Sequence, residues 1–188
     1  MDVILEATLA MADAGFAMHW LKAGEKIPVT SGWSSAPVAT PDELRRTYRS
    51  GFNVGFRPGS YSVVEGREVC VMDIDIRGGE RFVDEAYAAA NSIMESRFLP
   101  TVVSGSGIGR HQYLSFPVGG APIKAATVLR ESDVWILDEC IVPPLHKGAR
   151  PAWQIELLST GKQVVTPPSI HPATGNQYEW AGGRNPWA

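Results

Sequence analysis

The spacing of apolar residues along the chain predicts helices separated by many short strands. Apolar residues at helical spacing after Asp2 predict a first helix that ends near Gly15. A second helix should begin at residues 40–43, which carry a capping threonine, a proline and a capping-box glutamate, and end at Gly51. The helical period returns over residues 82–93, which predicts a third, longer helix.

Stretches rich in β-branched and aromatic residues, bounded by glycine and proline, predict strands. They lie at residues 16–20, 53–56, 61–64, 68–76, 101–103, 111–116, 134–137, 153–158, 163–166 and 177–180. The strands at 153–158 and 163–166 are expected to pair with each other around the Thr160-Gly161 turn. Residues 120–150 have the least regular pattern of apolar and polar residues. The chain is therefore predicted to have a mixed α+β fold.

The strand at residues 68–76 is a long apolar run that closes on two aspartates one residue apart. Successive side chains of a strand point to opposite faces, so Asp73 and Asp75 share a face. Two neighbouring carboxylates repel each other unless a cation lies between them. We interpret the pair as part of a site for a hard divalent metal ion that handles phosphates. A solvated strand end is the alternative.

Residues 104–111 form a glycine-rich turn that leads into a strand. The turn lacks the Gly-Lys-Ser/Thr ending of a P-loop, and no helix follows it as in a dinucleotide-binding fingerprint. Its glycines would let the backbone approach a ligand closely, with Arg110 and His111 as donors to an anion. A flexible hairpin with an incidental histidine is the alternative.

Two later stretches add candidate residues. Glu156 lies within an apolar strand, where a carboxylate is costly unless it is paired or bound to a metal. An edge strand that turns Gln154 and Glu156 to water is the alternative. Further on, two prolines fix a rigid turn before Ser169 and His171, which would hold both towards a ligand, unless the segment is simply a stiff loop.

Composition changes this picture little. Hydrophobic residues make up 44% of the 188 residues, which is ordinary for a globular protein. The net charge of −3 argues against a protein that coats nucleic acid through a strongly basic surface. Cys70 and Cys140 lack the paired neighbours of a zinc site and give no sign of an oxidising compartment. With no long apolar stretch and no signal-peptide pattern at the start, we expect a cytoplasmic protein.

The order of the four polar elements is more specific than any one of them. An acidic pair, a glycine-rich turn into a histidine strand, a third acidic strand and then Pro-Pro-Ser-x-His closely resemble the archaeo-eukaryotic primase superfamily. Within it, the chain resembles the bifunctional primase–polymerase (prim-pol) domain of the plasmid and phage replication type. Three flanking segments agree: Lys26-x-Pro28 followed by Gly32-Trp33, Asn53-Val54-Gly55-Phe56, and Tyr178-Glu179-Trp180.

The resemblance covers residues 15–180 and implies a fold and a site. The fold would be one prim-pol catalytic domain over residues 1–188, with a central, mostly antiparallel sheet, an RRM-like core and flanking helices. It would be the N-terminal part of a longer replication protein. Asp73, Asp75 and Glu156 would hold Mg²⁺ or Mn²⁺, with Glu156 where the family usually has aspartate. His111 would bind the nucleotide, and Gly109 stands where some relatives have serine.

The implied function is template-directed transfer of nucleotides to a 3′-hydroxyl, in DNA priming and polymerisation. The partners would be a single-stranded DNA template, a primer and NTP or dNTP, with a helicase or helical accessory region on the same chain. Weaker candidates for phosphate or template contacts are Arg110, Lys162, Ser169, His171 and Lys26. Trp20 and Trp33 are candidates for base stacking, or for packing.

Other classes of function stay open from the residues alone. A metal-dependent nuclease or phosphohydrolase also uses clustered carboxylates, and an Asp-x-Asp glycosyltransferase is a third enzyme option. A non-catalytic domain that binds nucleic acid or nucleotide is the remaining alternative.

Overall fold

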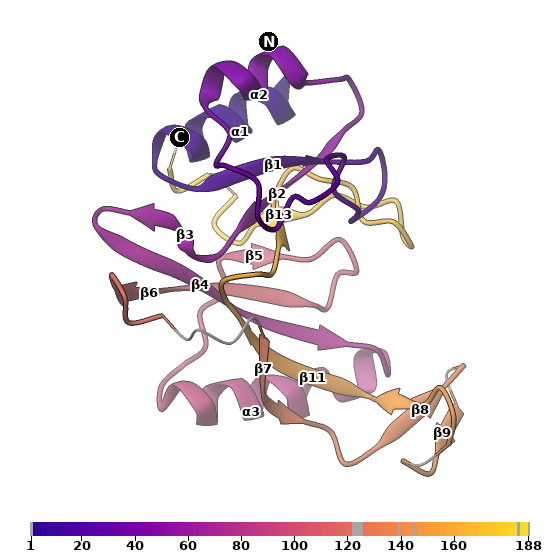
Figure 1. Cartoon of the computed structure of the whole chain (residues 1–188). Coiled ribbons are helices and arrows are strands. Elements are labelled where there is room, and N and C mark those ends of the chain that lie inside the picture. The colour runs from indigo at the N-terminus through magenta and orange to yellow at the C-terminus, as the bar shows by residue number, and fades with distance from the viewer. Residues whose placement is uncertain (1, 122–125, 139, 145, 184, 188) are drawn as a thin grey trace.

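The structure is a computed structural model that describes residues 2–121, 126–138, 140–144, 146–183 and 185–187 (Figure 1). It is mixed α+β with antiparallel strand pairing, as predicted. The helical elements are α1 (Val3–Asp13), α2 (Pro41–Thr47), the 3₁₀ turn η1 (Glu80–Phe82) and α3 (Val83–Met94). Thr40 caps α2 through the predicted capping box with Glu43, but the helix ends at Thr47 rather than at Gly51.

The large sheet carries the predicted acidic strand at its centre. Within the described residues its strand order is β13-β5-β6-β4-β11-β7, and β3 also pairs with β4. The bounds are β3 (Gly59–Val64), β4 (Arg67–Ile76), β5 (Val102–Val103), β6 (Arg110–Pro117), β7 (Ala126–Glu131), β11 (Trp153–Leu158) and β13 (Glu179–Trp180). The strand that ends on the two aspartates is therefore flanked by the histidine strand β6 and by the glutamate strand β11.

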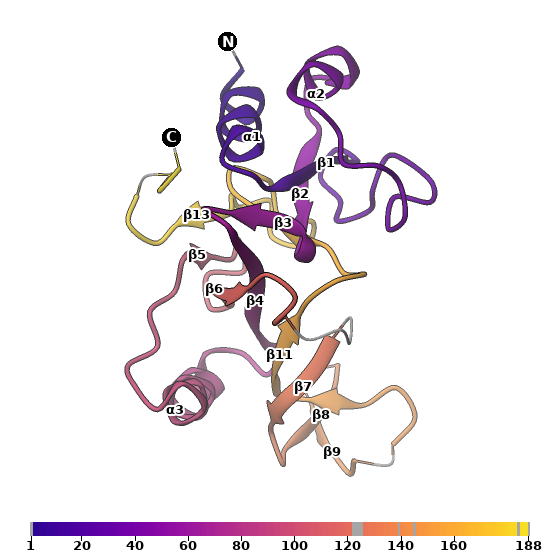
Figure 2. The same cartoon turned by 60° about the vertical axis from the view of Figure 1, so that its left-hand side comes forward.

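Two smaller sheets lie at opposite ends of the molecule. One has the order β1-β2-β12 and lies beneath α1 and α2, as Figure 2 shows. Its strands are β1 (Ala17–Leu21), β2 (Asn53–Arg57) and β12 (Val164–Val165). The other forms the projection at the lower right of Figure 1 and consists of β8 (Trp135–Leu137), β9 (Cys140–Val142) and β10 (Arg150–Pro151).

Alternate residues of β4 pack in two separate apolar cores, one on each face of the sheet. Val69 and Val71 pack in a core that includes residues of α1, β1 and β2. Met72, Ile74 and Ile76 face the other way and pack with α3 and β11. Because β4 is covered on both faces, its sequence is a nearly continuous apolar run. The polar residues at its end are therefore held by a strand that packing fixes on both sides.

The predicted pairing of residues 153–158 with residues 163–166 is wrong. β11 pairs with β4 and β7, whereas β12 crosses to the small sheet and pairs with β2. Gly55 makes this crossing possible, because a Cβ there would lie 2.8 Å from the carbonyl oxygen of Val164. A local turn signal at residues 160–161 gave no indication of a partner so distant in sequence.

Residues 120–150 contain strands that the sequence pattern did not predict. These are β7, β9 and β10, of which β9 and β10 are three and two residues long. Residues 122–125, 139 and 145 of this stretch lie outside the described residues. Strands as short as β9 and β10 contain too few residues to show an alternating pattern. The pattern also missed β7, which is six residues long.

The segment after β12 is fastened to β2 by buried side chains. The Ser169 hydroxyl donates to the Val54 carbonyl oxygen at 2.9 Å and accepts from the Val54 amide at 2.8 Å. Next to it, the Asn53 side chain accepts from the Ile170 amide and donates to the Ile170 carbonyl oxygen, at 2.8 and 2.7 Å. Both Ser169 and Asn53 are almost fully buried, so these bonds fix the course of the chain towards His171.

Ser169→Ala should lower the free energy of unfolding by about 2 kcal/mol, because it removes two buried hydrogen bonds to Val54. The Val54 amide loses its serine acceptor, whereas the Val54 carbonyl oxygen still accepts from the Thr166 amide. Urea denaturation measures this change. Ser34→Ala, at an exposed serine, is the matched control and should change stability by less than about 0.5 kcal/mol. Equal stability of the two variants would contradict a structural role for Ser169.

Candidate functional site

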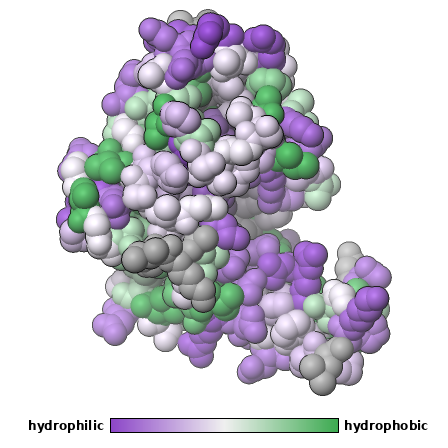
Figure 3. All heavy atoms as spheres, in the orientation of Figure 1, coloured by the Kyte–Doolittle hydropathy of each residue, from purple (hydrophilic) through white to green (hydrophobic). Residues whose placement is uncertain are grey.

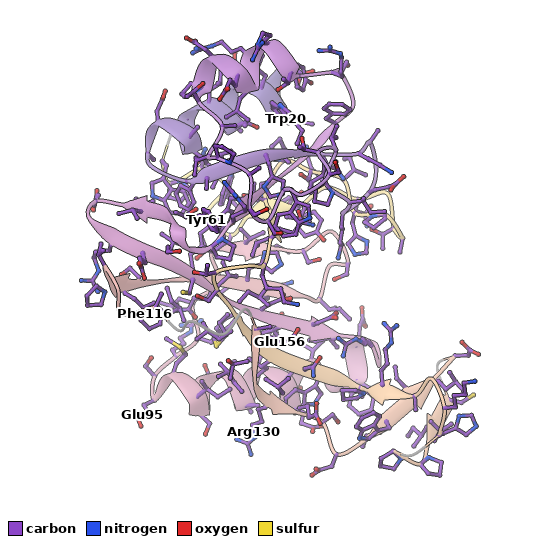
Figure 4. The ribbon with its side chains drawn as sticks, viewed as in Figure 1. Trp20, Tyr61, Glu95, Phe116, Arg130 and Glu156 are labelled. Carbon is purple, nitrogen blue, oxygen red and sulfur yellow. The ribbon has the colours of Figure 1, made fainter. Side chains whose placement is uncertain are left out.

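Three of the predicted site residues form one row across the large sheet. In the strand register, Asp73 of β4 lies directly opposite His111 of β6 on one side and Glu156 of β11 on the other. Residues directly opposite each other in an antiparallel pair point to the same face, with Cβ atoms about 5 Å apart. The sheet therefore brings an imidazole and two carboxylates from distant parts of the sequence together. Figure 4 shows Glu156 near the middle of the molecule, on β11.

Asp75 shares this face, two residues further along β4, and is paired with a cation. Arg77 Nη2 lies 2.8 Å from Asp75 Oδ2 and also donates to Gln154 Oε1 at 3.3 Å. Gln154 is opposite Asp75 in the strand register and donates to Glu131 of β7. Polar side chains thus continue along this face of the sheet beyond the row.

Asp73 lies where ionisation of a carboxyl group is unfavourable. Burial raises the pKa of Asp73 to about 7, with repulsion from Asp75 and Glu156 adding to the effect and Lys26 and Arg77 opposing it. Burial, together with Lys26, lowers the pKa of His111 to about 3. At neutral pH His111 is therefore uncharged, and Asp73 is ionised less readily than a free aspartate. The 3.4 Å contact between His111 Nε2 and Asp73 Oδ1 is then not a pair of full charges.

Lys26 reaches the same site from the loop that follows β1. It lines a small cavity of about 110 Å³ together with Asp73, His111, Gln163, Tyr178 and three apolar residues. Its Nζ lies 5.9 Å from the centre of the Tyr178 ring. This volume holds a few water molecules but is too small for a whole nucleotide. The cavity therefore brings an acidic group, Asp73, and a basic group, Lys26, together at one end of the row.

The buried Tyr178 ring connects His111 to the predicted His171. Its ring centre lies 6.0 Å from that of His111 and 5.8 Å from that of His171. The glycine-rich turn packs against the same place, because a Cβ on Gly105 would lie 2.5 Å from the His171 Cβ. Burial and Lys26 lower the pKa of His171. His171 therefore lies beside the row, partly exposed, behind the aromatic ring.

The remaining predicted residues lie elsewhere. Arg110 points to the α3 face of the sheet, where it donates to backbone oxygens of its own turn and lies 5.8 Å from the Tyr87 ring. Lys162 is exposed on the turn before β12, and Ser169 is buried in its contacts with Val54. Trp20 is 6% exposed and donates to the Leu44 carbonyl oxygen, as a packing residue does. Within the described residues, the hydrogen bonds of Arg110, Ser169 and Trp20 stabilise the fold and do not involve the row.

Sequence reasoning missed Arg77, Gln154 and Gln163 as members of the site. Arg77 follows the two aspartates in the same alternation, so the acidic strand gave a signal for it. Gln154 faces Asp75 only through the pairing register of β11 with β4, which the sequence pattern does not give. Gln163 precedes a strand whose partner was predicted wrongly, so no local pattern pointed to it. Lys26 was a candidate whose position needed the fold.

The three carboxylates have the chemistry that a hard divalent cation requires, although they do not converge on one point in this structure. Three carboxylates on one face supply the oxygen ligands that Mg²⁺ and Mn²⁺ prefer. Burial, and then repulsion from Asp75 and Glu156, raises the pKa of Asp73, and a bound cation would offset this cost of ionisation. Within the described residues, no three acidic, histidine or cysteine side chains are close enough to hold a metal as they stand. Binding would require Asp75 to turn from Arg77 towards Asp73 and Glu156.

The family can now be assigned. A sequence model of the N-terminal domain of bifunctional DNA primase/polymerases matches residues 8–188. The chain belongs to this Prim-Pol family. A comparison with curated protein sequences gave no match. The family implies DNA and nucleotides as substrates of a nucleotidyltransferase. In the described part of the Prim-Pol chain, no helix is long and apolar enough to cross a membrane.

Asp73→Asn should stabilise the metal-free protein at pH 8 by up to about 4 kcal/mol, because a pKa raised from 3.8 to about 7 opposes ionisation in the folded state. The wild type is not penalised below pH 3.8, where Asp73 is protonated in both the folded and the unfolded state, and it loses stability as the pH rises to about 7. The advantage of Asp73→Asn over the wild type should therefore shrink to less than about 1 kcal/mol at pH 4. Urea denaturation in a chelator measures both values.

Asp84→Asn, at an exposed aspartate in the first turn of α3, is the control and should have little effect at either pH. A loss of stability in Asp73→Asn at pH 8 would contradict the repulsion described for this row.

Proposed function

We propose that the protein is a metal-dependent primase–polymerase that transfers nucleotides to the 3′-hydroxyl of a primer on a single-stranded DNA template. The observation that supports this most is the row of Glu156, Asp73 and His111 on one sheet face, beside Asp75 and Lys26. Membership of the Prim-Pol family makes this chemistry the first expectation for such a row.

Asp73, Asp75 and Glu156 would hold one or two Mg²⁺ or Mn²⁺ ions. Such an ion neutralises charge on the reacting phosphate and the departing pyrophosphate and eases ionisation of the attacking hydroxyl. The chain contributes ligands of fixed spacing, because β4 is packed on both faces. Glu156 adds one methylene to the aspartate usual in the family, which lets its carboxylate reach inwards from β11.

His111 and Lys26 would bind the triphosphate of the incoming nucleotide. The neutral imidazole of His111 donates one hydrogen bond, and its Nδ1 is buried without a partner in the described residues. Lys26, which lines the same cavity, supplies the positive charge. His171 would contact phosphate or template at the edge of the site. Arg110, Lys162 and Ser169 have less support, because the fold places them away from the row.

The DNA would lie in an open notch beside the row. Figure 3 shows this indentation between the upper part of the molecule and the β8–β9 projection, with hydrophilic residues around it. The net charge of −3 predicts weak, salt-sensitive binding by this chain alone. A helicase or helical accessory region on a longer chain would strengthen the grip. A role in plasmid or phage replication and an RRM-like core are further parts of this proposal.

Asp73→Asn and Glu156→Gln should each reduce extension of a labelled primer on a DNA template by at least about 100-fold, because each removes a ligand of the proposed metal. The gel assay contains Mg²⁺ or Mn²⁺, with NTP and dNTP supplied separately. Asp84→Asn is the matched control and should extend normally.

Shortening of the primer without triphosphates would instead identify a nuclease. Binding without turnover would identify a non-catalytic module. An unprimed template in the same assay tests whether this chain begins a strand as well as extending one.

His111→Ala should raise the KM for the nucleotide about tenfold while the affinity for template changes less than twofold, because the imidazole is proposed to contact only the triphosphate. Steady-state extension and DNA binding by anisotropy measure the two quantities. The reverse pattern would remove His111 from the triphosphate site.

A further inference from the structure

The loop that carries Lys26 is held by side chains from other elements. Gln163, just before β12, donates from its Nε2 to the carbonyl oxygen of Lys26. The buried Asn53 of β2 donates from its Nδ2 to the carbonyl oxygen of Glu25 at 3.0 Å. Two consecutive residues of the loop are thus fixed through their backbone. Among the described residues the Lys26 ammonium makes no hydrogen bond or ion pair and lies over the Tyr178 ring, where it can contact a ligand in the cavity.

Gln163 is fixed in turn by His19 of β1. His19 Nε2 lies 2.8 Å from Gln163 Oε1. An amide oxygen only accepts hydrogen bonds, so His19 carries its proton on Nε2 and donates it. The other Gln163 contact uses its amide nitrogen, so the bonds run in one direction, from His19 through Gln163 to the Lys26 backbone.

Trp33 and Arg57 support the start of this chain of contacts. The Trp33 ring stacks on the His19 ring, with centres 5.5 Å apart and planes at 29°. Arg57 of β2 donates to the carbonyl oxygens of Trp33 and Ala36, at 3.0 and 2.7 Å. The loop from Lys26 to Trp33 is therefore tied to β1 and β2 at both ends.

We propose that Gln163 and His19 are positioning residues that hold Lys26 on the wall of the catalytic cavity, where it binds the triphosphate of the incoming nucleotide. This inference rests on the proposed function, because it names the group that Lys26 binds there. Gln163 and Lys26 both line the cavity that contains Asp73 and His111. Binding through a lysine on an unanchored loop would also require the loop to be ordered, so a backbone that is already anchored makes the contact with phosphate stronger.

A purely structural role for Gln163 makes a different prediction. A residue that only stabilises the fold would affect triphosphate binding whether or not Lys26 is present. A residue that acts through Lys26 would lose its effect once the lysine side chain is gone.

The test is a double-mutant cycle on Gln163→Met and Lys26→Ala, with dATP and Mg²⁺ and without DNA, measured by titration calorimetry. Methionine has nearly the shape of glutamine but no N–H group, so it cannot donate to the Lys26 carbonyl oxygen, and its sulfur is at most a weak acceptor for His19. Gln163→Met should raise the Kd for dATP about fivefold in the wild-type background and less than twofold in the Lys26→Ala background. Lys22→Ala, at an exposed lysine of the same loop, is the control and should leave the Kd unchanged.

Equal effects of Gln163→Met in both backgrounds, or an unchanged Kd, would overturn the positioning role. His19→Phe, which keeps a ring against Trp33, gives a second cycle if Gln163→Met melts at a much lower temperature. A wild type that binds dATP but does not extend primers would contradict the proposed function alone. If the wild type extends primers but the effects of the two substitutions are additive, the positioning role alone is overturned. If the wild type binds no dATP, the positioning role and the proposed function are both overturned.

Discussion

The pairing register of three neighbouring strands is the constraint on which the site depends. Asp73 lies opposite both His111 and Glu156 because β4 pairs with β6 and β11 in one fixed alignment. A slip of one residue between β4 and β11 would turn Glu156 to the face that packs on α3. The two apolar cores prevent such a slip, since Val71 and Met72 belong to different cores on opposite faces. Packing therefore determines where the charges lie.

The charges of the site come from two different parts of the fold. The large sheet supplies the carboxylates, whereas the loop between β1 and α2 supplies Lys26. Gly55 lets β12 approach β2, and this approach places Gln163 beside the Lys26 loop. The acidic row and the cation thus depend on contacts between segments far apart in the sequence. Both act on the pKa of Asp73, which burial and then its carboxylate neighbours raise and which Lys26 lowers.

The sequence predicted what alternation and local capping determine. The α+β class, the capping box of α2 and the shared face of Asp73 and Asp75 follow from spacing alone. Glu156 as the third acid came from the resemblance to the family, because a carboxylate in a strand has several explanations. The alignment of Glu156 with Asp73 could not be predicted, since a strand pattern does not name its partner or its register. For the same reason the pairing of residues 163–166 was predicted wrongly and Gln163 was missed.

The decisive measurement is a crystal structure with Mn²⁺ and a non-hydrolysable dNTP analogue. The proposed metal site predicts anomalous density for manganese among the carboxylates of Asp73, Asp75 and Glu156, with the triphosphate in contact with His111 and Lys26. Manganese bound without Glu156, or a triphosphate bound on the α3 face of the sheet, would contradict it.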